Sequence, residues 1–375
     1  MREFGTSLKS IVIVARKPVH LRSRTRASFY LPLVRWHAEL RRRGYAIRWS
    51  DQTSLPTGGA DYVLLDQRAF SQMGLSEFSE FAANWRKRTA NLIWLDSSDS
   101  TGTTRFEILP LVDRYLKRHL LREPSWYQSQ MRGRRFHEQE FERKLSSQVL
   151  EPPTMEPPQT PLPAKAFPKV GLLWTFAYLD FSVASRFSEV RSLVKRGFPD
   201  RPLYGGSKPL HVAAPFSSGH PGATGVARRL ALDVANAAGW GGAGANLTLR
   251  SYRRLLALSR ILVSPFGLGE YCLRDFEASW FGACLAKPSV EHIATFPSIL
   301  KPGITYIPLS WDPQKWPEEV EQLTHAQIDT VANGLAEWAR ALSSPTVRDQ
   351  FLDHLVECAL NAGWCGRCER GWWSD

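Results

Sequence analysis

The chain has 375 residues, 43% of them hydrophobic and 22% charged, which is typical of a globular protein with room for two domains. The sequence contains no run of 18 apolar residues, so we expect no transmembrane helix. The apolar stretch at 11–15 is too short for a signal peptide and leads directly into charge, so we expect a cytoplasmic protein. Five unevenly placed cysteines do not indicate a disulfide scaffold.

The net charge of +12 is concentrated at the start of the chain. Residues 1–50 contain 12 Arg and Lys against 2 Glu, so they carry +10 and the remaining 325 residues only +2. Arg22 and Arg24 follow a predicted strand, where they could meet anionic lipid, a phosphorylated acceptor or nucleic acid. The run at 41–43 fits a solvated helix face equally well.

Residues 1–150 alternate short apolar strands, predicted at 11–15, 45–49, 61–65 and 91–95, with helices at 27–43 and 76–88. This alternation predicts a parallel sheet covered on both faces, with ligands at the carboxyl ends of the strands. The segment 96–103, DSSDSTGT, follows the fourth strand and contains Asp96 and Asp99. We interpret it as an acceptor contact or an interdomain closure segment, and a cluster of Asx turns explains it equally well.

Seven prolines between residues 152 and 168 exclude a helix or a central strand and predict a semi-stiff linker. We therefore expect an N-terminal domain at 1–150, a Pro-rich linker at 151–168, a second α/β domain at 169–345, and a C-terminal helix with a Cys/Trp tail at 346–375. Strands are predicted in the second domain at 169–174, 209–214, 259–263 and 305–309. The helices are predicted at 181–196, 226–238, 249–259, 272–280, 318–342 and 346–360.

The second domain contains two segments that suit an anion. The Gly/Ser-rich loop at 215–225 leads into a helix whose first turn would hold Arg228 and Arg229, although an ordinary flexible loop explains the composition as well. The segment 264–289, SPFGLGEYCLRDFEASWFGACLAKPS, has the composition of a strand end, a glycine turn and a helix. Gly267 and Gly269 would supply a positive φ or a close approach to a ligand, and the helix N-terminus would favour negative charge.

This segment resembles the nucleotide-sugar site of bacterial group-1-like GT-B glycosyltransferases, written roughly as SPFGxGExxxRDFEAxxxGAxLxKPxxxH. The matching residues are Ser264, Pro265, Gly267, Gly269, Glu270, Arg274, Asp275, Glu277, Ala278, Gly282, Ala283, Lys287, Pro288 and His292. The resemblance extends over residues 250–312. One feature departs from it: retaining GT-B enzymes space two glutamates eight residues apart, whereas Glu270 and Glu277 are seven apart.

The resemblance implies a fold of two facing Rossmann-like parallel-sheet domains and transfer of a sugar from a nucleotide diphosphate to a hydroxyl, without a metal or other cofactor and with retention. It assigns Glu270 and Arg274 to catalysis and Glu277 to the ribose hydroxyls. The other matching residues that it assigns to the nucleotide sugar are Gly267, Gly269, Lys287 and His292. Arg228 and Arg229, at the start of the helix after the Gly/Ser-rich loop, are added as cationic candidates for the diphosphate. The competing interpretations are a solvated acid for Glu277, an internal ion pair for Arg274 and a core histidine for His292.

The expected acceptor is a glycan, a lipid-linked sugar or a small molecule in polysaccharide, lipopolysaccharide or secondary-metabolite synthesis, contacted by Arg22, Arg24, Asp96 and Asp99. The basic start of the chain could also hold the protein at an anionic inner-membrane surface, and no nucleic-acid motif occurs. Two alternatives stay open, a non-catalytic GT-B-like binding subunit and a basic nucleic-acid-binding protein. His354, Cys358, Cys365 and Cys368 have the ligand types of a zinc site or a dithiol, but incidental cysteines explain them as well.

Overall fold

The computed structural model describes residues 8–15, 24–50, 58–129, 135–145, 159–175, 206–220, 222–342 and 344–360, with the backbone alone at 24–28 and 142–145. The predicted helix at 181–196 lies outside these ranges, as do Arg22, Cys365 and Cys368. Within the described residues, no helix is both long and apolar enough to cross a bilayer.

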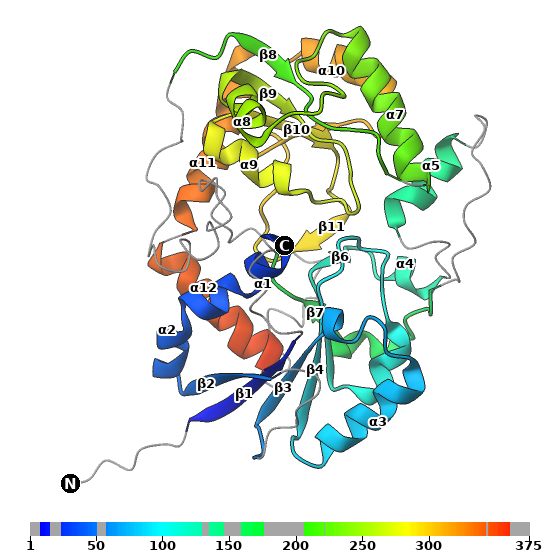
Figure 1. The fold of residues 1–375 in the computed structure, drawn as a ribbon, viewed down its shortest axis with the longest axis vertical. Coiled ribbons are helices and arrows are strands. Elements are labelled where there is room, and N and C mark those ends of the chain that lie inside the picture. The colour runs from blue at the N-terminus through cyan, green and yellow to red at the C-terminus, as the bar shows by residue number, and fades with distance from the viewer. Residues whose placement is uncertain are drawn as a thin grey trace.

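Six parallel strands in the order β2-β1-β3-β4-β5-β7 form the first sheet (Figure 1). They are β1 (Lys9–Val14), β2 (Tyr45–Ser50), β3 (Tyr62–Asp66), β4 (Asn91–Asp96), β5 (Arg114–Lys117) and β7 (Val170–Leu172). Successive side chains of a strand point to opposite faces. Ile11 and Ile13 accordingly pack in the core that contains Trp36, whereas Val12 and Val14 pack in the core that contains Trp85. The helices of this domain are α1 (Arg24–Arg35), α2 (His37–Arg42), α3 (Leu75–Arg86) and α4 (Ser125–Gln128).

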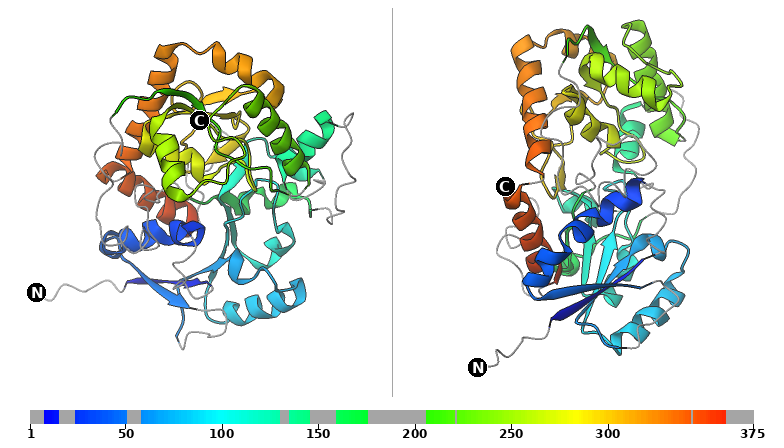
Figure 2. Two further views of the ribbon diagram at one scale, coloured as in Figure 1. Left: turned by 45° about the horizontal axis from the view of Figure 1, so that its top comes forward. Right: turned by 60° about the vertical axis from the view of Figure 1, so that its left-hand side comes forward.

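The second sheet has four parallel strands in the order β12-β10-β9-β8. They are β8 (Leu210–Ala213), β9 (Ser259–Val263), β10 (Cys284–Pro288) and β12 (Ile307–Leu309). The helices are α7 (Gly222–Ala237), α8 (Leu249–Leu258), α9 (Leu273–Phe281), α10 (Trp316–Glu321) and α11 (His325–Ala341). The predicted α/β class, with two facing Rossmann-like parallel-sheet domains, is confirmed (Figures 1 and 2).

The boundary between the domains differs from the prediction. The predicted strand at 169–174 was expected to open the second domain, but β7 pairs with β5 and completes the first sheet. The described part of the proline segment also packs on the first domain, where Leu162 is buried and its N–H donates to Tyr127 O at 2.7 Å. Before that, α5 (Phe136–Leu145) contacts α7 of the second domain, so the chain reaches the second domain and returns to the first before β8 begins.

A two-stranded antiparallel sheet joins the two domains. It pairs β6 (His119–Leu121), which follows the first sheet, with β11 (Ile293–Thr295), which follows the second. The sequence analysis did not predict these strands, because three residues are too few to show a hydrophobic period. Shared backbone hydrogen bonds therefore fix the domains relative to each other at this point.

The C-terminal helix α12 (Pro345–His354) returns to the first domain, and the turn Leu355–Leu360 continues it (Figure 2). The buried ring of Phe351 packs against Trp36 and Trp174, with centroids 5.1 and 5.2 Å away. Arg43 forms ion pairs with Asp349, at 3.3 Å, and with Asp353. A return of this kind is common in GT-B proteins, but the sequence did not establish it here.

His354, at the end of α12, makes the stability of the protein depend on pH. Its Nε2 lies 2.9 Å from Leu172 O and its ring stacks on Phe296. Burial lowers the pKa of His354 to about 4, although the bond to Leu172 opposes this. The unfolded chain then binds a proton that the folded chain does not, so stability falls as pH drops from about 6.5 to about 4. We expect His354→Gln to remove up to about 3 kcal/mol of that fall.

Urea unfolding between pH 4 and 7.5 measures this difference. His37→Gln, at an exposed end of α2, serves as the matched control and should keep the wild-type dependence. An unchanged slope in His354→Gln would contradict the assignment.

Candidate functional site

The turn after β9 is held by an ion pair inside the second domain. Lys287 is fully buried, and its amine donates to Glu270 O at 2.6 Å and to the carboxylate of Asp275. Asp275 also accepts from Ser264 Oγ at 2.6 Å and from Cys272 N at 2.9 Å. Lys287 thus stabilises the turn in this structure. Its predicted role, binding a diphosphate, requires an accessible amine, and this amine is buried.

Glu270 lies at the carboxyl end of the second sheet but is bound by the first domain. Its fully buried carboxylate accepts from Ser100 Oγ at 3.0 Å, from Thr101 Oγ1 at 2.8 Å and from Thr101 N at 3.1 Å. His137 Nδ1 lies 3.5 Å from Glu270 Oε1. Burial by itself would raise the pKa of Glu270, but His137 and the Thr101 hydroxyl outweigh it and hold the pKa below its usual range.

Glu270 was predicted to face the donor sugar as a catalytic residue. In this structure it instead clamps the two domains together, because both of its oxygens are taken by groups of the first domain. Of the interpretations given to the segment 96–103, interdomain closure therefore has direct structural support.

Position 269 in this turn tolerates no side chain. A Cβ atom there would lie 1.9 Å from the carbonyl oxygen of Asp99, in the first domain. Gly267 is close to Cys272, since a Cβ atom would lie 3.2 Å from its Sγ. Neither glycine has a positive φ. The close approach predicted for this turn thus occurs, but at Gly269 the neighbour is the other domain.

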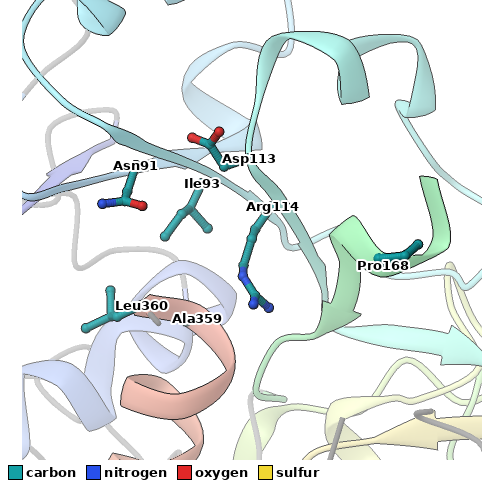
Figure 3. Close-up of a pocket in the computed structure, with 7 residues that line it drawn as sticks. All are labelled: Asn91, Ile93, Asp113, Arg114, Pro168, Ala359 and Leu360. Atoms are coloured by element: carbon teal, nitrogen blue, oxygen red, sulfur yellow. The ribbon is translucent and has the colours of Figure 1, made fainter. Parts of the chain in front are cut away.

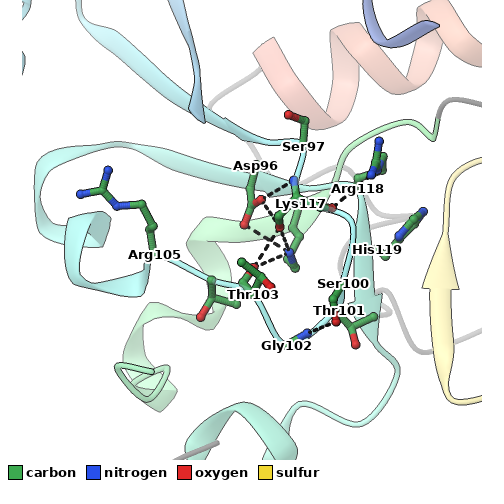
Figure 4. Close-up of polar contacts among 12 residues, drawn as sticks. Asp96, Ser97, Ser100, Thr101, Gly102, Thr103, Arg105, Lys117, Arg118 and His119 are labelled. Atoms are coloured by element: carbon green, nitrogen blue, oxygen red, sulfur yellow. Dashed lines mark hydrogen bonds and ion pairs between the residues drawn. The ribbon is translucent and has the colours of Figure 1, made fainter. Parts of the chain in front are cut away.

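The first-domain side of the interface is a turn held by buried polar contacts (Figure 4). Asp96 is fully buried and accepts from Ser98 N at 2.9 Å, Tyr115 Oη at 2.5 Å and Lys117 Nζ at 3.3 Å. Lys117 also donates to Ser98 Oγ and Thr103 O, both at 2.6 Å. Asp96 was predicted to contact the acceptor, but it is sealed inside the turn that presents Ser100 and Thr101.

Asp99 differs from Asp96 in its exposure. Its side chain is 39% exposed and forms an ion pair with the fully buried Arg118. Of the four residues predicted to contact an acceptor, Asp99 is the one whose described side chain reaches solvent; Arg24 is described by its backbone alone.

A cluster of basic groups lies beside the turn in the second domain. Buried Arg228 donates from Nε to Ser217 O at 2.7 Å and from Nη1 to Phe266 O at 2.8 Å. Burial, with the neighbouring charge of Arg274, lowers the pKa of Arg228 to about 10. Arg274 is half-buried, and its Nε is buried without a hydrogen-bond partner. Arg228 and Arg274 are thus brought together as predicted.

Glu277 is buried beside Arg274. Its Oε2 accepts from Tyr252 Oη at 2.5 Å, and burial together with Glu277 raises the pKa of that tyrosine, whose hydroxyl also interacts with Arg274. A solvated helix acid is therefore the wrong interpretation for Glu277. Tyr252, on α8, is a partner that the sequence analysis missed, and helical periodicity offers no signal for it.

His292 lies near the interface between the two domains, among aromatic rings. Its ring lies between Phe136 and Trp311, with centroids 5.3 and 5.2 Å away, and burial lowers its pKa to about 4. The aromatic packing favours the core interpretation, although Nε2 is buried without a hydrogen-bond partner.

Neither helix N-terminus is open to an anion in the way the sequence suggested. Asp275 accepts from Cys272 N at the start of α9. Helix α7 begins at Gly222, several residues earlier than predicted, and Glu138 of α5 accepts from Thr224 N at 3.4 Å and Thr224 Oγ1 at 2.7 Å. Arg228 consequently lies in the second turn of α7 and Arg229 is exposed. Attraction for an anion must come from the side chains.

A pocket at the first sheet lies outside this site. A pocket of about 120 Å³ is lined by Asn91, Ile93, Asp113, Arg114, Pro168, Ala359 and Leu360 (Figure 3). It lies where β4 and β5 begin, at the edge of the sheet opposite to Asp96.

The described residues contain no group of three or more His, Cys, Asp and Glu side chains placed to hold a metal ion.

No family model and no curated protein matches this sequence. Among solved structures, the chain is similar to HepE of Anabaena in complex with UDP-glucose, at 9% identity and a TM-score of 0.42, over 93% of this chain and 99% of HepE. It is also similar to MnaA of S. aureus with UDP, at 8% identity and a TM-score of 0.40, over 96% of this chain and 99% of MnaA. At these values the likeness assigns no ligand and no reaction to this chain.

The contact at Gly269 gives a sharp test of the interface. We expect Gly269→Ala to destabilise the protein by about 1–3 kcal/mol or more, because the methyl group overlaps Asp99 backbone and the domains or the turn must move apart. Thermal unfolding and small-angle scattering measure the loss and any expansion. Gly74→Ala, where a Cβ atom meets nothing within 4 Å, is the control. Equal stability and scattering for Gly269→Ala would contradict the packing described.

Proposed function

We propose that this chain is a glycosyltransferase that takes its sugar from a nucleotide diphosphate. The observation that carries the proposal is that two groups lie on the same helix, α9. Arg274 has a buried Nε without a hydrogen-bond partner, and the buried carboxylate of Glu277 accepts a hydrogen bond from Tyr252. A guanidinium group suits a diphosphate and a carboxylate suits the ribose diol, so the two ends of a nucleoside diphosphate find complementary groups side by side.

The proposed reaction needs no group other than those side chains and an acceptor. The bond between the anomeric carbon and the diphosphate oxygen breaks, and its electron pair leaves with the diphosphate. The acceptor oxygen bonds to the carbon on the face from which the diphosphate leaves, and its proton goes to the departing diphosphate oxygen. Arg274 and Arg228 would stabilise the charge on the leaving diphosphate electrostatically. We propose retention and metal independence from the motif resemblance, with a glycan, lipid-linked or small-molecule acceptor.

The second candidate is a GT-B-like protein that binds a nucleotide sugar without transferring it. The burial of Glu270 favours it, because the carboxylate expected beside the donor sugar is bound by Ser100 and Thr101. Transfer would require the domains to open at this contact. Turnover, and not binding, therefore separates the two candidates.

A thermal-shift panel of nucleotide-diphosphate sugars tests the proposal. We expect one donor to raise the melting temperature, since a ligand that binds only the folded state stabilises it. Arg274→Gln and Glu277→Ala should each weaken binding by about tenfold or more, the worth of a hydrogen bond to a charged group. Arg250→Gln, at an exposed position of α8, should bind as wild type does.

The same donor is then incubated with the protein and candidate acceptors, and the products are analysed by mass spectrometry. A glycosylated acceptor and free nucleotide support transfer. Binding without turnover supports the second candidate. If no donor in the panel shifts the melting temperature, both candidates are overturned.

A further inference from the structure

The loop before α7 places a histidine in the basic cluster. A Cβ atom at Gly267, in the turn after β9, would lie 3.9 Å from His220 Nε2 and 3.2 Å from Cys272 Sγ, so the histidine ring lies close to this turn. A Cβ atom at Gly225 would lie 1.9 Å from His220 O, so the histidine backbone is pressed against α7. The loop was predicted to bind an anion because of its glycines and serines, and its histidine carried no predicted role.

Two buried donor or acceptor atoms lack partners at this place. They are Nδ1 of His220 and Nε of Arg274. A buried polar atom without a hydrogen bond costs free energy, and a ligand that bonds to such an atom recovers it. The charges around His220 indicate whether such a ligand is an anion or a cation.

Four charged groups act on His220. Three are positive: Arg228 on α7, Arg274 on α9 and Arg135 before α5. The fourth is Glu138, on α5, whose charge is shared with Arg135 through an ion pair of 2.6 Å. Burial and the three arginines lower the pKa of His220, and Glu138 opposes them. The cluster is thus short of negative charge, which a diphosphate would supply.

We propose that His220 is a third basic group of the diphosphate site and takes up a proton from solvent when the diphosphate binds. The inference rests on the proposed function, which supplies the ligand. The bound anion reverses the repulsion from the arginines, so the imidazole becomes a cation that donates a hydrogen bond to a phosphate oxygen. His220 thereby strengthens the grip on the leaving group without a permanent charge in the empty site.

The sign of the pH dependence follows from this exchange. Because binding raises the pKa of His220, affinity is highest at low pH and falls as pH rises through the pKa of the bound state. We expect about tenfold weaker binding at pH 8 than at pH 6, which requires binding to raise the pKa of His220 by more than about one unit.

Calorimetric titration with UDP, GDP, ADP and, as a base-free probe, inorganic pyrophosphate tests the inference at pH 6, 7 and 8, in buffers of different ionisation enthalpy. His220→Gln should bind about tenfold more weakly than wild type at pH 6 and nearly equally at pH 8, and it should take up fewer protons. The ionisation of the ligands is common to both proteins and cancels in the comparison. His211→Gln, at an exposed position of β8, should match wild type.

A purely structural role for His220 would weaken binding equally at each pH, and this result overturns the inference while the proposed function stands. Proton uptake that is the same in wild type and His220→Gln overturns it too. If Arg274→Gln and Glu277→Ala leave binding unchanged while His220→Gln alters its pH dependence, the anion site is real and the proposed nucleotide site fails. If no probe and no nucleotide sugar binds, both proposals fail.

Discussion

The arrangement of this protein depends on one buried carboxylate shared between two domains. Glu270 leaves the second sheet and is bound by Ser100 and Thr101 of the first. A buried charge is tolerated only when hydrogen bonds replace water, and removing its partners costs on the order of 3–5 kcal/mol. The turn of Asp96 and Lys117 is built rigidly enough to supply those bonds. The close approach at Gly269 and the β6–β11 pairing are further contacts between the same two domains.

This closure decides which charges remain available for a ligand. Lys287, Asp275 and Glu270 satisfy one another or the first domain. The carboxylates of Asp275 and Glu138 occupy the starts of α9 and α7. Arg274 and His220 each retain a buried nitrogen without a partner. The proposed anion site therefore depends on these side chains and not on the helix N-termini.

Much of the fold is predictable because it depends on local patterns. The strands at 11–15, 45–49, 61–65 and 91–95 are short apolar runs between polar segments, and each is observed. The patterns do not specify pairing partners, so the strand at 170–172 was assigned to the wrong sheet. The same distinction applies to the site. Local patterns point to Arg228, Arg274 and Glu277 as candidates, whereas Tyr252 and His220 come from α8 and a loop with no periodic or motif signal.

The sequence by itself determined the α/β class, the two domains and the segment that contains Glu270, Arg274 and Glu277, because hydrophobic period, turn residues and motif spacing are local. Only the tertiary structure decided what each charged side chain does. Burial and distance fix that role, and both depend on residues far away in the chain. Glu270 is separated by about 170 residues from Thr101, and that contact makes the carboxylate a clamp between domains.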